Sequence, residues 1–189
     1  MNINPTSSYK IRFNDCDLFG HLNNSSYLDY FINAREDHLK EYYGLDLSEY
    51  YKNGLGWVVG NHEIAYVKPA YYNEIITIQS TLLSVSVDLL QVETIMMDEN
   101  QSQLKAIMRT KLIPVNIKTG RKEQHQEDFL DWAKTIENTE VNKTQDLQER
   151  IKLVLFELKA KHCFHAIFTS LTKFNFCPTS PCCTNGYQI

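Results

Sequence analysis

The stretch Asp15-Cys16-Asp17-Leu18-Phe19-Gly20-His21-Leu22-Asn23-Asn24-Ser25-Ser26-Tyr27 places two carboxylates, a glycine and a histidine directly before a helix start rich in capping residues. The segment before it, Tyr9 to Phe13, alternates apolar and polar residues, which predicts a short half-buried strand. After it, apolar residues recur at three- and four-residue steps as far as Tyr43, and Gly44 supplies the expected stop. Asp15 to Leu22 are therefore expected to form a strand-to-helix loop, and a helix of about twenty residues follows from Asn24 onward.

Such a junction favours acyl-transfer chemistry. The first turn of a helix leaves backbone N–H groups without partners, and the helix dipole adds partial positive charge, so this point attracts anions and developing oxyanions. Asp17 is then a candidate nucleophile or general base, and N–H groups near Asn24 are candidates to hold a carbonyl oxygen. In the competing interpretation, Asp15 and Asp17 only form a turn and charge the helix start, and His21 is a hydrogen-bonded structural histidine.

The whole string decides between these interpretations. Asp17-x-x-Gly20-His21-Leu22-Asn23-Asn24-x-x-Tyr27-Leu28, followed by Ala34-Arg35, closely resembles the signature of hot-dog-fold thioesterases of the 4-hydroxybenzoyl-CoA thioesterase and acyl-CoA thioesterase group. The part from His21 to Tyr27 is also similar to plant-type acyl-ACP thioesterases. The resemblance implies catalytic roles for Asp17, His21 and Asn24, and substrate contacts for Gly20, Asn23 and Tyr27. It assigns the chemistry to Asp17 and not to Cys16, which we expect to be a small buried residue.

Beyond the long helix the pattern changes to strands. β-rich runs cover residues 57–67, 75–87, 89–97 and 104–117, and the short polar breaks between the later runs suit antiparallel hairpins. One strand, a long helix and then these strands predict an α+β fold, in which a curved antiparallel sheet wraps the helix. This layout agrees with the hot-dog fold. The segment Ile64 to Ile75 also resembles the strand-turn-strand element of that family, although Asn73-Glu74 stands where a Gly-Asp turn is usual.

Composition narrows the functional classes. The chain has 189 residues, of which 43% are hydrophobic, enough for one core. A net charge of −4 gives no reason to expect a nucleic-acid partner. The N-terminus lacks the pattern of a secretory signal, and no apolar run reaches the length of a membrane span, so we expect a cytoplasmic protein without membrane contact.

The C-terminal part differs from the rest. Residues 1–149 carry a net charge of −8 and residues 150–189 a net charge of +4. We therefore expect a thioesterase domain at residues 1–140 and a C-terminal extension of uncertain structure at 141–189. Residues 147–156 have the spacing of an amphipathic helix. The remainder is left open as a disordered extension, a partner-binding segment or sequence from an altered reading frame, and a chain ending at Asn142 is expected to fold and to be active.

Four of the five cysteines lie in that extension. Together with two histidines they suggest a zinc site, but the spacing is not one that structural zinc sites use, so we expect no metal. The residues concerned are His162, Cys163, His165, Cys177, Cys182 and Cys183.

The sequence thus predicts an enzyme that hydrolyses aryl- or fatty acyl-CoA to the free acid and coenzyme A without a cofactor. Acyl-ACP hydrolysis and noncatalytic acyl-CoA binding are the alternatives. The resemblance implies a homodimer joined edge to edge, with the acyl pocket at its interface, or a homotetramer of two such dimers. We expect Arg35 to form ion pairs at the surface or at an interface.

Overall fold

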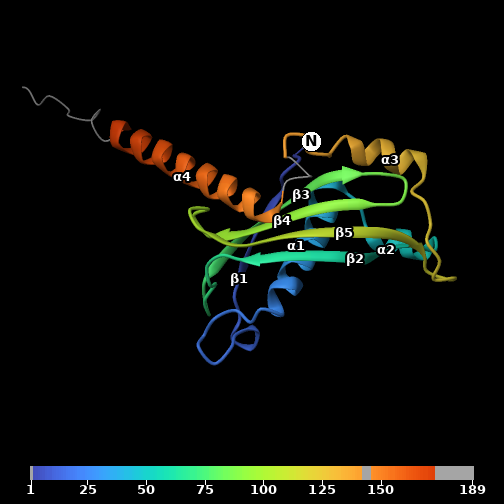
Figure 1. Cartoon of the computed structure of the whole chain (residues 1–189), viewed down its shortest axis with the longest axis horizontal. Helices are drawn as coiled ribbons and strands as arrows, with labels where there is room; N and C mark the ends of the chain where they lie inside the picture. Colours follow the sequence, from blue (N-terminus) through green and yellow to red (C-terminus); the bar gives the residue numbers. More distant parts are fainter. Residues whose placement is uncertain (1, 142–145, 173–189) are drawn as a thin grey trace, which may run out of the picture.

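The computed structural model describes residues 2–141 and 146–172, with side chains as far as residue 161. In this part of the chain a five-stranded antiparallel sheet wraps a long helix, α1 (Figure 1). The strand order is β1-β3-β4-β5-β2. The elements are β1 (Thr6–Lys10), α1 (Ser26–Tyr43), α2 (Leu47–Lys52), β2 (Leu55–Tyr66), β3 (Ile75–Val85), β4 (Leu90–Asp98), β5 (Leu104–Asn116), α3 (Glu127–Lys134) and α4 (Leu147–Thr172). This arrangement confirms the predicted α+β fold.

The sequence of α1 explains its position inside the sheet. Its buried residues, Tyr27, Phe31, Ala34 and His38, are spaced by three and four residues and form one stripe. Gly44 ends the helix at a φ of 66°, and its N–H donates to the carbonyl of Lys40. The stripe packs on β3, β4 and β5, where Ile76, Ile78, Met96, Ala106 and Met108 complete the main core cluster.

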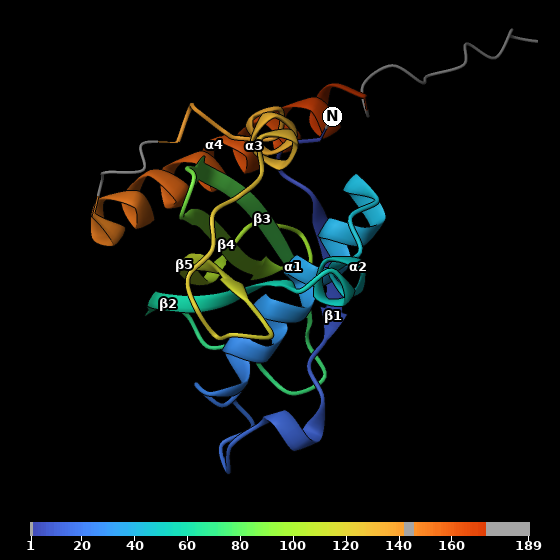
Figure 2. The ribbon, with the colours of Figure 1, turned by 90° about the vertical axis from the view of Figure 1, so that its right-hand side faces the viewer.

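The two faces of the sheet carry different helices. Along β4, Met96 faces α1, whereas its neighbours Ile95 and Met97 face the other way and pack against α4. Turning the molecule by 90° shows α1 and α4 on opposite sides of the sheet (Figure 2). The sheet is therefore covered on both faces.

The packing of α4 is the main addition to the expected fold. The predicted amphipathic helix is present, and it runs on past the sheet (Figure 1). Its residues Leu147, Ile151, Val154 and Leu158 pack on Ile95, Met97, Leu104 and Ile107 of β4 and β5. Beneath this contact the buried Glu93 carboxylate pairs with Arg109 Nε and Arg150 Nε, each at 3.0 Å. Residues Leu147 to Leu158 of α4 thus form part of the core, although we expected the fold to be complete before them.

The first strand differs from its prediction. β1 spans Thr6–Lys10, and Phe13, the last residue of the predicted strand, instead begins the 3-10 turn Phe13–Asp15. Ile11 still donates to the Glu74 carbonyl, after which Asp15 and Cys16 donate to carbonyls of the turn itself. Local turn bonds have therefore replaced the ladder.

None of the described helices is long and apolar enough to cross a membrane.

Candidate active site

The loop before α1 is a closed turn held on a neighbouring segment. Asp17 N–H donates to the His21 carbonyl at 2.8 Å, and Gly20 N–H donates to the Asp17 carbonyl at 3.1 Å. Gly20 has a φ of 74°, a conformation that residues with a Cβ rarely adopt. Its carbonyl accepts from Tyr72 N–H, and Leu22 N–H donates to the Ala70 carbonyl, both at 2.8 Å. The loop is thereby fixed to the segment between β2 and β3.

Two backbone donors hold the Asp17 carboxylate. Its Oδ1 accepts from the N–H of Phe19 at 2.9 Å and from the N–H of His21 at 3.0 Å. Within the described residues, Oδ2 has no hydrogen-bond partner. The carboxylate is exposed, so one oxygen orients the group while the other is available to water or substrate.

The His21 imidazole lies against an aromatic ring that is itself held in place. The ring centroids of His21 and Tyr71 are 5.1 Å apart at a T-shaped angle. Tyr71 N–H donates to Glu74 Oε2, and Glu74 Oε1 pairs with Lys105 Nζ at 2.6 Å. Asp17 thus contacts His21 through the backbone N–H of His21. The His21 imidazole packs against the Tyr71 ring instead.

Asn23 and Asn24 form the turn directly before α1. Asn23 Oδ1 accepts from Ser25 N–H, and the Asn23 carbonyl accepts from Ser26 N–H, so Asn23 closes a turn directly before the helix, whose N-cap residue is Ser25. The Asn23 N–H donates to the Asp15 carbonyl at 2.8 Å. In the described part of the chain the Asn24 N–H has no partner. Asn24 lies just before the positive end of the helix dipole, so this N–H suits a developing oxyanion.

Tyr27 is engaged inside the protein. Its hydroxyl oxygen accepts from Ala70 N–H at 3.1 Å, and its ring contacts Tyr66, whose hydroxyl donates to the Asn24 carbonyl at 3.0 Å. These two tyrosines join the helix start to β2 and to the segment after it. The predicted contact of Tyr27 with substrate stays a prediction, as do the roles of the other five site residues.

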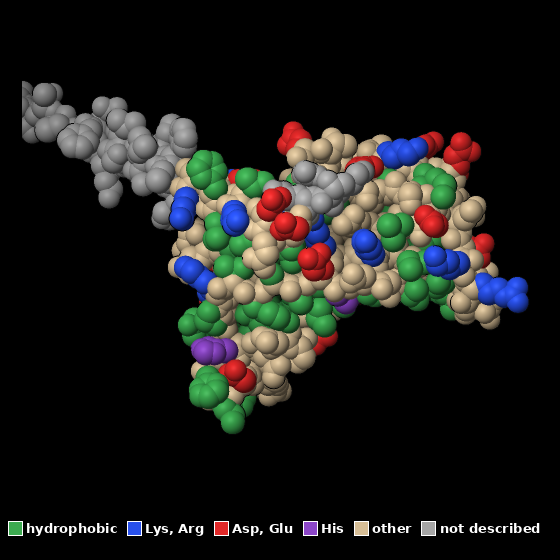
Figure 3. Space-filling view, viewed as in Figure 1, with side chains coloured by type: hydrophobic (Ala, Val, Ile, Leu, Met, Phe, Trp, Pro, Cys, Tyr) green, Lys and Arg blue, Asp and Glu red, His purple; other side chains and the backbone are tan. Residues whose placement is uncertain are grey.

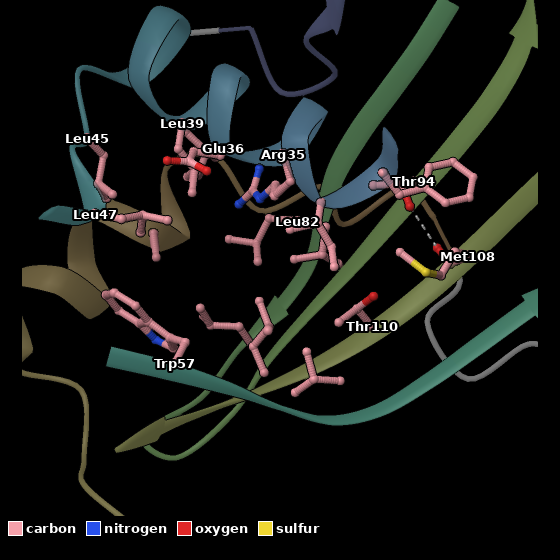
Figure 4. A pocket seen from close by; sticks show the side chains of 18 of the residues that line it. Arg35, Glu36, Leu39, Leu45, Leu47, Trp57, Leu82, Thr94, Met108 and Thr110 are labelled. Carbon is pink, nitrogen blue, oxygen red and sulfur yellow. Dashed lines mark hydrogen bonds between the residues drawn. The ribbon is translucent and has the colours of Figure 1, made fainter. Parts of the chain in front are cut away.

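The surface around this loop is apolar. Phe13, Leu18, Phe19, Tyr71 and Tyr72 are exposed, and hydrophobic side chains gather at this end of the molecule (Figure 3). A cavity of about 240 Å³ lies elsewhere, between α1 and the inner face of the sheet (Figure 4). None of the six predicted site residues lines it.

Comparison with known proteins decides the family. The model of the thioesterase-like superfamily matches residues 11–133, well over half of the chain. The chain belongs to the thioesterase-like superfamily. Membership in this superfamily supports a thioester hydrolase. Among curated proteins, none matches the chain.

Solved structures agree with this assignment of the fold. The DHNA-CoA thioesterase of Staphylococcus aureus superposes with a TM-score of 0.64 at 20% identity, over 70% of this chain and 89% of that one. YbaW, a probable thioesterase from Escherichia coli, superposes with a TM-score of 0.60 at 23% identity, over 69% of this chain and 96% of that one. The protein SAV2348 of S. aureus, solved in complex with CoA, superposes with a TM-score of 0.62 at 14% identity, over 71% of this chain and 85% of that one. At such identities the likeness shows the hot-dog fold of this thioesterase-like protein.

Asn73 lies in the segment between β2 and β3, and Cys16 lies in the loop before α1. Asn73, which stands where a glycine is usual, has a φ of 68°, a conformation that asparagine tolerates better than most residues. Asparagine therefore supplies the positive φ that this turn has. Cys16 is partly exposed instead of buried, and its thiol donates to the Arg12 carbonyl. Burial and the charges of Asp15 and Asp17 raise the pKa of this thiol, which disfavours the reactive thiolate.

The surface ion pair expected for Arg35 does not form within the described residues. Arg35 lines the cavity, and no ion pair involves it in the described part of the protein. Arg109 lies on the opposite face of the sheet and binds Glu93. The only signal for Arg35 was its place beside the apolar stripe of α1, one turn after Phe31. The side chains of the possible zinc ligands, from His162 onward, lie outside the described part of the structure.

Proposed function

We propose that this protein hydrolyses acyl-CoA thioesters to a free acid and coenzyme A, in the manner of the 4-hydroxybenzoyl-CoA thioesterase group. The observation that carries the proposal is the Asp17 carboxylate, which two N–H groups orient through Oδ1 and which leaves Oδ2 open. Superfamily membership supports the reaction type. The names of two structural neighbours, a DHNA-CoA thioesterase and a protein solved with CoA, favour coenzyme A as the carrier.

Asp17 has two routes to the product. As a general base, Oδ2 takes a proton from water, and the resulting hydroxide attacks the thioester carbonyl carbon. As a nucleophile, Oδ2 attacks that carbon itself, the C–S bond breaks, and water then hydrolyses the mixed anhydride. Both routes give the acid and the thiol, and both require an ionised carboxylate fixed in one orientation.

The tetrahedral intermediate carries its negative charge on the former carbonyl oxygen. The Asn24 N–H at the start of α1 is the proposed donor to this oxygen, and Tyr66 helps to fix it by binding the Asn24 carbonyl. A thiolate leaves with little need for a general acid because thiols are acidic. His21, held on Tyr71, is proposed to orient water or substrate beside Asp17. These residues suffice for the reaction, so no metal or organic cofactor is expected.

An acyl-ACP substrate is the first alternative, because the Asn23-Asn24 pair also fits acyl-ACP thioesterases. A noncatalytic acyl-CoA-binding protein is the second. Both Asp17 and His21 are present in the loop, which counts against it.

A thiol-release assay separates these possibilities. The purified protein is given aryl-, short-chain and long-chain acyl-CoA, and the same acyl groups on acyl carrier protein. We expect turnover of at least one acyl-CoA class, with the carrier-protein substrates slower. Binding of acyl-CoA without release of thiol would contradict the proposal.

A further inference from the structure

The cavity between α1 and the sheet is apolar over most of its wall and is lined by one arginine. Its volume of about 240 Å³ holds roughly eight non-hydrogen atoms, if each takes about the 30 Å³ of a water in the liquid. Leu39, Leu82 and Met108 contribute to the lining, and Arg35 reaches from α1 toward the sheet (Figure 4). The cavity therefore suits a short apolar chain that carries one group able to accept from a guanidinium.

Arg35 has an unused donor in this cavity. Its Nη1 is fully buried and has no hydrogen-bond partner among the described residues, although the side chain as a whole keeps some exposure. Burial lowers the pKa of Arg35 to about 10, with a partial offset from Tyr43, so the group is still a cation near neutral pH. A buried charged donor without a partner is costly, so a ligand that accepts from it would be stabilised.

The groups that surround Arg35 do not neutralise it. Glu36, the next residue on the cavity wall, is exposed and forms no ion pair with Arg35 in the described structure. The His38 ring nitrogens are hydrogen-bonded to Ser7 Oγ and Ser80 Oγ. His62 Nδ1 is hydrogen-bonded to Thr110 Oγ1 at 2.9 Å.

We propose that this cavity binds a short apolar carboxylate of about eight to ten non-hydrogen atoms in all, with the carboxylate on Arg35. A carboxylate forms strong, charge-assisted hydrogen bonds with a guanidinium. The leucines of the cavity and Met108 would bury the apolar chain of the ligand. The carboxylate has two possible sources. It is either a free carboxylic acid or the far end of the acyl group in a thioester, and only the second source rests on the proposed function.

Binding can be measured without any hydrolysis. Trp57 and Trp132 are the only two tryptophans in the chain, and both line the cavity. Their fluorescence is therefore a direct probe during titration with octanoate and with 1-octanol, which has the same chain and no charge. We expect octanoate to bind at least about tenfold more tightly at pH 7. Equal affinities of the wild-type protein for octanoate and 1-octanol would overturn the proposal, and so would a lack of octanoate binding.

A substitution assigns the effect to the guanidinium. Arg35→Met should remove the preference for octanoate over octanol, and Arg35→Lys should keep part of it. Lys40→Met is the matched control, because it removes a positive charge from the same helix at an exposed position away from the cavity, and the preference should persist. Wild-type affinity for octanoate in a folded Arg35→Met protein would contradict the assignment.

The two sources are separated by substrates. If the carboxylate is the end of an acyl group, kcat/KM for suberoyl-CoA exceeds that for octanoyl-CoA, and Arg35→Met reverses the order. If it is a free acid, octanoyl-CoA is the better substrate while octanoate still binds. Failure to hydrolyse any thioester would count against the proposed function alone, because the fluorescence titration does not depend on it.

Discussion

Asp17 has one oxygen held and one open, so its charge can be removed with little change of shape. Asp17→Asn keeps an oxygen to accept from Phe19 and His21 N–H but removes the base or nucleophile. We expect turnover to fall by at least about 10² fold. Steady-state thiol release with an unchanged melting temperature is the measurement.

Two variants of the same loop serve as comparisons. Asp15→Asn should have much less effect, because the Asp15 carboxylate accepts from the Tyr30 hydroxyl at 2.7 Å and has a structural role. His21→Ala should fall between the two, since His21 orients and does not attack. Near-normal turnover of Asp17→Asn would transfer the catalytic role to Asp15 or to Glu63, an exposed residue of β2.

His38 makes stability depend on pH. Burial, and then the nearby Arg35 charge, lower its pKa from 6.5 to about 4, with Asp37 acting in the opposite direction. The folded state therefore prefers the neutral ring. The stability this gives is fully present above pH 6.5 and is lost as the pH falls toward 4, by on the order of 2 kcal/mol. Urea unfolding at pH 7 and pH 5 should show the loss, and His38→Gln should reduce it. An unchanged pH dependence in that variant would contradict this prediction.

The residues that could be identified from sequence are those that lie close together in the chain. Asp17, Gly20 and His21 form one turn, so their spacing alone brings them together. Contacts that depend on tertiary packing could not be found in this way, such as the Tyr66 hydroxyl on the Asn24 carbonyl. The position of Arg35 on the cavity wall was missed for a related reason. A charged residue beside an apolar stripe usually turns outward, and only the shape of the sheet leaves a cavity beneath it.

At the scale of elements, periodicity predicted α1 and the four later strands within a few residues. The exception, β1, is an edge strand that pairs only with β3, so local turn bonds compete successfully with its last ladder positions. The helix at the start of α4 was predicted, but its packing partner was not. A helical stripe shows that one face is apolar without showing which surface it covers.

The ion pairs beneath α4 can be tested with one substitution. Arg150→Met leaves the buried Glu93 with Arg109 but removes its second partner. We expect a loss of about 2 kcal/mol in the free energy of unfolding, less than for a fully broken buried pair. Lys152→Met, an exposed change on the same helix, should stay within about 0.5 kcal/mol of the wild type. Equal stability of the two variants in chemical denaturation would argue against this role for Arg150.

Removal of the extension should have a larger effect. A chain ending at Asn142 exposes Ile95, Met97, Leu104 and Ile107 on the outer face of the sheet. Their burial is worth about 5 kcal/mol or more, comparable with the whole stability of many domains. The structure therefore reverses the expectation from sequence, and we predict low soluble yield or a much lower melting temperature. Recovery of a stable, active truncated protein would show that the α4 contact is dispensable.

At the scale of the whole molecule, the two edges of the sheet differ. β1 is short, whereas β2 has twelve residues and is hydrogen-bonded to β5 along one side. Val58 and Val59 are exposed on it. A long edge strand with exposed apolar residues is prone to pair with another strand unless it is protected. A second copy of the same strand is the partner that closed symmetry provides.

We therefore predict a homodimer in which two β2 strands join into one continuous sheet. Light scattering at micromolar concentration should give twice the mass of the chain. Val58→Lys places two new charges at the joined edges, and we expect the dimer dissociation constant to rise at least about tenfold. Val87→Lys, an equally exposed valine in the turn between β3 and β4, should leave it unchanged. Because the thioester site is expected to be completed by the partner, turnover per chain should fall with the dimer fraction. A wild-type monomer with full turnover would overturn both the assembly and the shared site.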